Sequence, residues 1–251
     1  MIFLVAFALP YFFYCLFEKK NYFSNPLILF LVIFSPAIFS WKMAMNPVIK
    51  ITEHAEWNSF WNQVIYWPLV LVTIASILFI IWLLFYRAES FFGLTTKNFK
   101  WKPYLIMLNI MIPLIFLAST QPDFLWKYPK LDNIKNELAT VENKWLNKLL
   151  CELTYGSDFI SVEHFFSGFL NLGFIKIAGK DAILPMACFY CTIHFGKPLG
   201  ECISSYFGGM FLCIIVFHTR SIMGGLTVHL GIAWLMELGA QSGKSFFIKF
   251  S

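Results

Sequence analysis

Three ionisable side chains lie in apolar stretches of the sequence, where charged residues are rare. Glu163 lies in one such stretch, and His194 and His229 each lie in a later one. A charge in hydrocarbon is costly unless it is paired or neutralised, so such residues usually serve a function. One carboxylate and two imidazoles could activate a water molecule, relay protons or bind a metal ion, and their spacing does not separate these three chemistries.

Other polar residues of these stretches could support the first three. Ser167 lies four residues after Glu163, on the same face of the predicted helix, whereas His164 lies about 100° round it. We interpret His164 as a packing or interface histidine. Glu237 follows His229 by eight residues. It is either a further carboxylate of the site or a residue at the level of the lipid headgroups.

His194 precedes Gly196 and Pro198, a pair that commonly ends helices. We therefore expect it at a helix end, where a neutral imidazole can accept a proton or position a water molecule. The alternative is a histidine that only caps the helix. Cys188 and Cys191 form a C-x-x-C pattern before it, but a zinc site is the less favoured interpretation, because cysteines in apolar runs mostly act as small hydrophobes.

The composition places these residues in a membrane. Hydrophobic residues make up 59% of the chain and charged residues 13%, and the mean hydropathy is +0.68. A soluble domain has about 25% charged residues, so one globular core cannot hide this apolar surface. The net charge of +5 forms no dense basic stripe. It suits lipid headgroups and not nucleic acid. The six cysteines are scattered and do not indicate a disulfide framework.

The apolar stretches predict an all-α fold. A spanning helix needs about 20 mostly apolar residues, and about eight stretches come near that length, some of them short. They cover residues 2–17, 27–41, 64–86, 104–119, 159–175, 182–194, 205–217 and 222–239. We expect a polytopic membrane helical bundle of about eight transmembrane helices, with a four-helix catalytic core in the C-terminal half. Lys and Arg divide almost evenly between alternate loops, so the orientation stays open.

The chain divides into three segments in sequence order. Residues 1–120 hold the N-terminal membrane helices, 121–158 form a polar connection, and 159–240 hold the ionisable residues named above. Within the connection, residues 131–150 have apolar side chains near helical spacing and predict an amphipathic helix. We interpret it as a surface helix that covers one end of the bundle. The alternative is a lid that faces the substrate.

The C-terminal stretches resemble the CPBP family of intramembrane proteases, named for CAAX proteases and bacteriocin-processing proteins and also called Abi. Its signature has three parts, each on its own helix. They are Glu-Glu-x-x-x-Arg-Gly, then an aromatic residue four positions before a histidine (aromatic-x-x-x-His), then His-x-x-x-Asn or Asp. The corresponding residues here are 162–168, Tyr190 with His194, and His229 with Ala233. The resemblance covers roughly residues 159–238.

The resemblance implies a type II CAAX prenyl endopeptidase-like enzyme in a bacterial inner membrane, with the lipid bilayer around it. Its substrate would be a membrane-associated peptide or protein, such as one with a prenylated CAAX end. Glu163 with His194 would activate a water molecule as general base, and His229 would stabilise the oxyanion. A mechanism without a cofactor and one in which these three residues bind a divalent metal such as zinc are both compatible with this set.

Three positions depart from the family signature. Val162 replaces the first Glu, Ser167 replaces the Arg, and Ala233 replaces the Asn or Asp. Loss of the Arg removes a rigid donor of several hydrogen bonds to the glutamate. The second hypothesis is therefore a catalytically impaired relative that acts as a binding or bacteriocin-immunity membrane protein. A transporter or proton-coupled channel ranks third, since no inverted repeat is evident.

Overall fold

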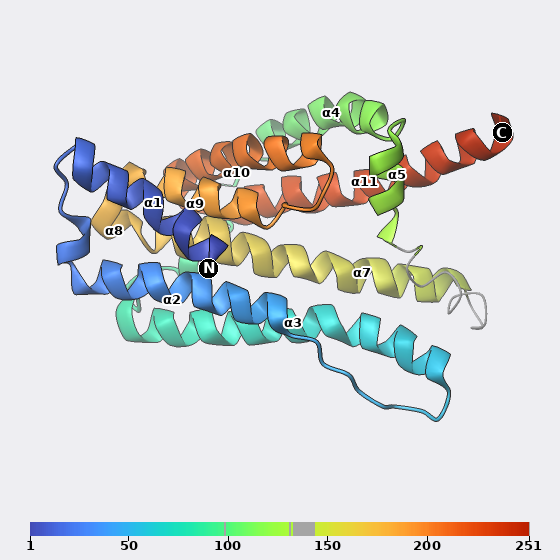
Figure 1. Ribbon diagram of the computed structural model, residues 1–251, viewed down its shortest axis with the longest axis horizontal. Coiled ribbons are helices and arrows are strands. Elements are labelled where there is room, and N and C mark those ends of the chain that lie inside the picture. The colour runs from blue at the N-terminus through green and yellow to red at the C-terminus, as the bar shows by residue number, and fades with distance from the viewer. Residues whose placement is uncertain (98, 131, 133–143, 251) are drawn as a thin grey trace. The chain divides into compact units, whose positions relative to one another are not determined.

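The computed structural model describes residues 1–97, 99–130, 132 and 144–250, and within these ranges the chain forms helices and no strand (Figure 1). Four helices of the described part are long and apolar enough to cross a membrane. They are α2 (Pro26–Ala44), α3 (Ala55–Phe85), α4 (Trp101–Ala118) and α10 (Leu199–Thr219). The predicted all-α membrane fold is confirmed to this extent, but the predicted number of about eight spans is not.

The other four predicted spans correspond to shorter, broken or more polar helices. The first is α1 (Ile2–Phe17), which has 16 residues, and the sixth is α9 (Ile183–Thr192), which has 10. The fifth is divided among the end of α7 (Lys144–Glu163), a π-helix η4 (His164–Leu172) and α8 (Ile175–Ala178). The eighth is α11 (Met223–Phe250), which contains His229 and Glu237.

Four short helices complete the described chain. They are η1 (Tyr22–Ser24), η2 (Phe91–Gly93), α5 (Pro122–Lys127) and η5 (Gly179–Ala182). The amphipathic helix predicted over residues 131–150 lies mostly outside the described residues. Only its last part, from Lys144 onward, is described, and it forms the start of α7.

The helices belong to two compact units that each combine distant parts of the sequence. The first unit contains Met1–Met45, Ile74–Phe99 and Val162–Gly225, and the second contains Asn46–Thr73, Lys100–Ser161 and Leu226–Ser251. Helices α3, α7 and α11 each contribute residues to both units. The three segments expected from the sequence therefore describe chain order and do not coincide with the compact units.

The core of the first unit consists largely of phenylalanine rings. Phe7 of α1, Phe39 of α2 and Phe189 of α9 are at most 1% exposed. The Phe189 ring centroid lies 5.6 Å from that of Phe7 and 5.7 Å from that of Phe39, within the range of favourable ring pairs. Helix α9 packs against both α1 and α10 (Figure 1). This core fixes the position of α9, which precedes His194.

Helix η2 of the first unit approaches η4 closely at glycines. A Cβ on Gly168 would lie 2.7 Å from the carbonyl oxygen of Phe92, so a side chain there requires the backbone to move. Gly93 has a φ of +77°, in the left-handed region that favours glycine. Its carbonyl oxygen accepts a hydrogen bond from the N–H of Ile222 at 3.0 Å. The approach of Gly168 to Phe92 places η2 against η4, which directly follows Glu163, and the bond to Ile222 joins η2 to the start of α11.

In the second unit, α4 and α11 also approach each other at glycines. A Cβ on Gly239 would lie 3.1 Å from a methyl carbon of Ile115, and one on Gly243 would lie 2.4 Å from the carbonyl oxygen of Ser119. Gly239 and Gly243 are four residues apart, which is the spacing of small residues that lets membrane helices pack closely.

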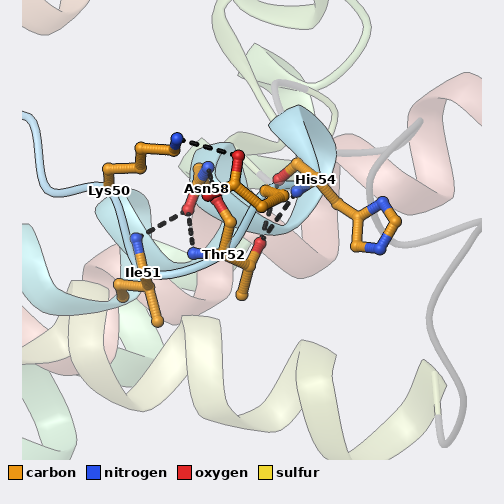
Figure 2. A network of polar contacts seen from close by, with 6 residues as sticks. Lys50, Ile51, Thr52, His54 and Asn58 are labelled. Carbon is orange, nitrogen blue, oxygen red and sulfur yellow. Dashed lines mark hydrogen bonds and ion pairs between the residues drawn. The ribbon is translucent and has the colours of Figure 1, made fainter.

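Asparagine side chains fix the chain that leads into α3, also in the second unit (Figure 2). Oδ1 of Asn58 accepts hydrogen bonds from the N–H groups of Ile51 and Thr52, each at 2.8 Å. Lys50 forms an ion pair with Glu53 at 2.9 Å. Backbone groups of this extended segment thus receive side-chain partners before the helix begins at Ala55.

Candidate functional site

Glu163 is the last residue of α7 and immediately precedes η4. It is 3% exposed. A Cβ on Gly225 would lie 2.1 Å from Oε1 of Glu163, so the carboxylate occupies space that any larger residue at position 225 would fill. Both residues belong to the first unit. The glycine therefore determines where this buried carboxylate can lie.

The backbone that follows Glu163 is a π-helix in which all nine residues are buried. π-Helical segments are rare, and those inserted in α-helices occur frequently at functional sites. The sequence predicted a single α-helix here, because its apolar residues also fit the α-helical repeat. The π-helix marks this segment as unusual independently of the residue types that it carries.

His194 lies in the turn that follows α9, as its position before Gly196 predicted. It is 8% exposed, and its Nδ1 lies 3.1 Å from the carbonyl oxygen of Tyr190. A carbonyl group can only accept a hydrogen bond, so Nδ1 carries the proton in this interaction. The neutral ring then has its lone pair on Nε2, which is the atom that can accept a proton in catalysis.

Tyr190 interacts with both Glu163 and His194. Its ring centroid is 4.8 Å from that of His194, and it interacts electrostatically with the Glu163 carboxylate. Two of the three predicted catalytic residues therefore interact with the same buried tyrosine within one compact unit. The sequence indicated Tyr190 only as the aromatic residue of a pattern, and not as a neighbour of the glutamate.

His164 and Ser167, the two supporting candidates of η4, are both buried. Nε2 of His164 lies 3.3 Å from the carbonyl oxygen of Phe91, and the Phe91 ring lies 4.4 Å away, nearly perpendicular to the imidazole. These contacts connect η4 to η2 and agree with the interpretation of His164 as a packing histidine. Ser167 is 4% exposed and lies in the middle of η4.

His229 and Glu237 lie on α11 in the second unit. The ring centroid of His229 is 5.0 Å from that of Phe159. Both carboxylate oxygens of Glu237 accept hydrogen bonds from the N–H of Lys130, at 2.9 and 2.8 Å. The third predicted catalytic residue thus belongs to a different unit from Glu163 and His194, and the convergence of all three stays a prediction.

Glu152 of α7 is a carboxylate that the sequence analysis did not single out, because it lies in the predicted polar connection. Burial and the charge of Glu237 raise the pKa of Glu152 to about 7. Its Oε2 is buried, and no described residue forms a hydrogen bond with that atom. The second unit therefore contains two neighbouring carboxylates, one of which holds its proton near neutral pH.

A further polar cluster lies in the first unit, where the ends of α1 and η5 meet. The Lys20 ammonium and the Tyr22 hydroxyl donate to Asp181. Burial of Asp181 opposes its ionisation, but these two hydrogen bonds outweigh burial and lower its pKa. A cavity of about 410 Å³ adjoins the cluster and is lined by Lys180 and Glu18 and by apolar residues of α9 and α10. The positive and negative side chains that line the cavity balance, so the cavity favours no particular ionic ligand.

No group of three or more His, Cys, Asp and Glu residues in the described ranges is arranged to hold a metal ion. The metal role of Glu163, His194 and His229 therefore stays a prediction. For the C-x-x-C pattern, the sulfur contact of Cys191 is with Cys202 of α10. The Sγ atoms of these two residues lie 3.8 Å apart.

Comparisons with protein-family models, with curated proteins and with solved structures give no match for this chain. The CPBP hypothesis accordingly stays a prediction from the residues that suggested it.

Proposed function

We propose that this chain is an intramembrane endopeptidase that uses Glu163 and His194 to activate a water molecule. The observation that carries the proposal is that a carboxylate and an imidazole, both more than nine-tenths buried, interact with Tyr190 within one unit. Paired groups of this kind, placed in a buried site, are suited to general acid–base catalysis.

In the proposed reaction, the Glu163 carboxylate takes a proton from water while the water oxygen attacks the carbonyl carbon of a peptide bond. The acid form of Glu163 then returns the proton to the leaving amine, so that one water molecule yields one carboxylic acid and one amine. Nε2 of His194 accepts a hydrogen bond from the same water and orients it. His229 is the proposed donor to the oxyanion, which requires the second unit to bring it to the substrate.

The proposed setting is a multi-pass protein of a bacterial inner membrane. Apolar helices in addition to the four long ones would complete about eight spans, and η4, α9, α10 and α11 would form the four-helix catalytic core. The proposed substrate is a membrane-associated peptide or protein, of which a prenylated CAAX end is one example. Exposed apolar side chains on the long helices are consistent with a lipid environment.

A peptidase assay in liposomes tests the proposal. The probe is a fluorescence-quenched peptide with a farnesylated CAAX end, and the variants are Glu163→Gln and His194→Gln. Removal of a general base or of the group that orients the water should lower kcat by about 10²-fold or more. His54→Gln is the matched control, because His54 lies in the exposed segment before α3. Full activity of both site variants would exclude the proposed site.

The second candidate function is that of a non-catalytic relative that acts in binding or in bacteriocin immunity. It is favoured by Ser167, which is buried in η4 where the family signature has an arginine. This candidate predicts no cleavage by the wild-type protein. It also predicts that cells producing the Glu163→Ala variant survive a bacteriocin as well as cells with the wild-type protein.

A further inference from the structure

Two cysteine side chains that have no part in the proposed catalysis lie in contact in the first unit. Cys191 belongs to α9 and Cys202 to α10, and their Sγ atoms are 3.8 Å apart. The Sγ of Cys191 also lies 3.5 Å from the carbonyl oxygen of Cys202. Both cysteines are free and partly exposed. The two sulfur atoms are therefore in van der Waals contact and reachable from outside the core.

The contact lies at the end of the helix pair. Cys191 is the second-last residue of α9, and Cys202 is in the first turn of α10. The connection between the helices contains Lys197, which forms an ion pair with Glu201 at 2.6 Å. The thiols thus lie near a turn that carries charged side chains, and both cysteines are partly exposed, so small soluble reagents can reach them.

We propose that Cys191 and Cys202 form a reversible disulfide that joins α9 to α10. A disulfide has an S–S bond of about 2.0 Å, so the two sulfur atoms need to approach by less than about 2 Å. The other cysteines are placed less well. Cys151 and Cys213 are buried, and Cys151 belongs to the second unit.

The oxidant in this proposal is a low-molecular-weight disulfide. One thiolate attacks a sulfur of the reagent, forms a mixed disulfide and releases one thiol. The second thiolate then attacks the protein sulfur of the mixed disulfide and releases the other thiol. Two protein thiols lose two electrons and two protons, and the reagent is reduced to two thiols. The described residues offer no third metal ligand at this place, which favours a disulfide over a metal site.

The bond would have a local consequence. It would close the chain segment between residues 191 and 202, which includes His194 and Gly196. Gly196 has a φ of +83°, so the turn already depends on a left-handed residue. The crosslink would limit how far this turn can open. The proposal of the disulfide does not rest on the proposed peptidase function.

Oxidation of the purified full-length protein in detergent micelles by oxidised glutathione tests the inference. After the reaction, free thiols are blocked with N-ethylmaleimide, and intact mass and peptide mapping are recorded. Once denatured, the oxidised wild-type protein should carry four maleimide adducts on its six cysteines, and the peptides with Cys191 and Cys202 should be linked. Reduction with dithiothreitol should restore all six.

Three single variants define the pair. Cys191→Ser and Cys202→Ser should each retain one glutathione as a mixed disulfide on the remaining cysteine and form no internal link. Cys188→Ser, one helical turn away, should form the link as the wild-type protein does. A link between Cys188 and Cys191, or a wild-type protein that retains six thiols at high oxidant, would overturn the inference. The wild-type peptide map alone decides this if a serine variant does not fold.

Discussion

The carboxylate of Glu163 lies against the backbone of Gly225, and this contact makes a substitution at position 225 informative. A methyl group there would lie 2.1 Å from Oε1, closer than any non-bonded contact allows. Gly225→Ala should therefore displace the carboxylate and lower peptidase activity by about tenfold or more, because small displacements of a catalytic group are costly. The liposome assay with the quenched peptide measures the loss.

Gly208→Ala is the matched control for this change. Gly208 lies within α10 of the same unit, and nothing lies within 4 Å of the position that its Cβ would take. An alanine there should leave activity unchanged and stabilise the helix slightly, by about 0.5–1 kcal/mol. Equal activity of the two variants would mean that the position of the Glu163 carboxylate does not matter for the reaction.

Sequence alone could single out Glu163 and His194 as candidates, because ionisable residues in apolar stretches stand out by type. It could not identify Gly225 or Glu152. The importance of Gly225 depends on a side chain 62 positions earlier in the chain, and no local pattern encodes such a contact. Glu152 lies among polar residues and became notable only when the structure placed it beside Glu237.

At the scale of elements, the pairing of α7 with α11 in the second unit predicts a pH effect on stability. The pKa of Glu152 is raised to about 7 by burial and by Glu237. A carboxyl whose pKa is raised on folding stabilises the folded state below its unfolded pKa of about 4.3, and this contribution is lost as pH rises through 7. Thermal stability of the wild-type protein should accordingly fall between pH 4.5 and pH 8.

The Glu152→Gln variant should lack this component of the pH dependence. It should match the wild-type protein near pH 4.5 and exceed it at pH 8 by about 1–2 kcal/mol, less than the full pKa shift implies, because Glu152 is only partly buried. Unfolding followed by tryptophan fluorescence in detergent measures both proteins. An identical pH dependence in the variant would contradict the interaction between Glu152 and Glu237.

Asp181→Asn serves as a control with the opposite sign. The pKa of Asp181 is lowered by Lys20 and Tyr22 in spite of burial, so its contribution is present above its unfolded pKa of about 3.9 and is lost as pH falls through the folded value. The variant should be less stable than the wild-type protein at pH 7 and should approach it at low pH.

Helix boundaries followed the sequence where a stretch had clear ends. The prediction of residues 2–17 coincides with α1, and the stretch predicted at 27–41 lies within α2. The stretch at 159–175 was predicted as one helix but forms three pieces. The cause lies in tertiary contacts, since Gly168 meets the carbonyl of Phe92, and hydrophobic periodicity contains no information about such a neighbour.

For the whole molecule, hydropathy alone does not settle the number of spans, because it does not distinguish side chains that face lipid from those that face protein. All nine residues of η4 are buried, so their apolar character serves the core of the first unit. Side chains of α4 such as Ile106 and Phe116 are more than half exposed, as expected for a surface in contact with lipid. Apolar stretches of this chain therefore have two different roles, one in the protein core and one at the surface that contacts lipid.

The membrane arrangement can be tested at the ends of α4. This helix has 18 residues and is about 27 Å long, close to the thickness of the hydrocarbon layer. In a cysteine-free background, Lys100→Cys and Gln121→Cys should react with a membrane-impermeant maleimide from opposite sides of the membrane. Labelling of both from one side would contradict a span at α4.

The same labelling at Lys180→Cys and Lys197→Cys decides between four spans and about eight. Helix α9 has 10 residues and is about 15 Å long, half of what a hydrocarbon layer requires. If α9 crosses with help from η5 and the turn around His194, these two cysteines react from opposite sides, as the proposed eight-span arrangement expects. Reaction from one side would leave His194 on a segment that enters and leaves the same membrane face, and water could then reach it without a path through the bundle.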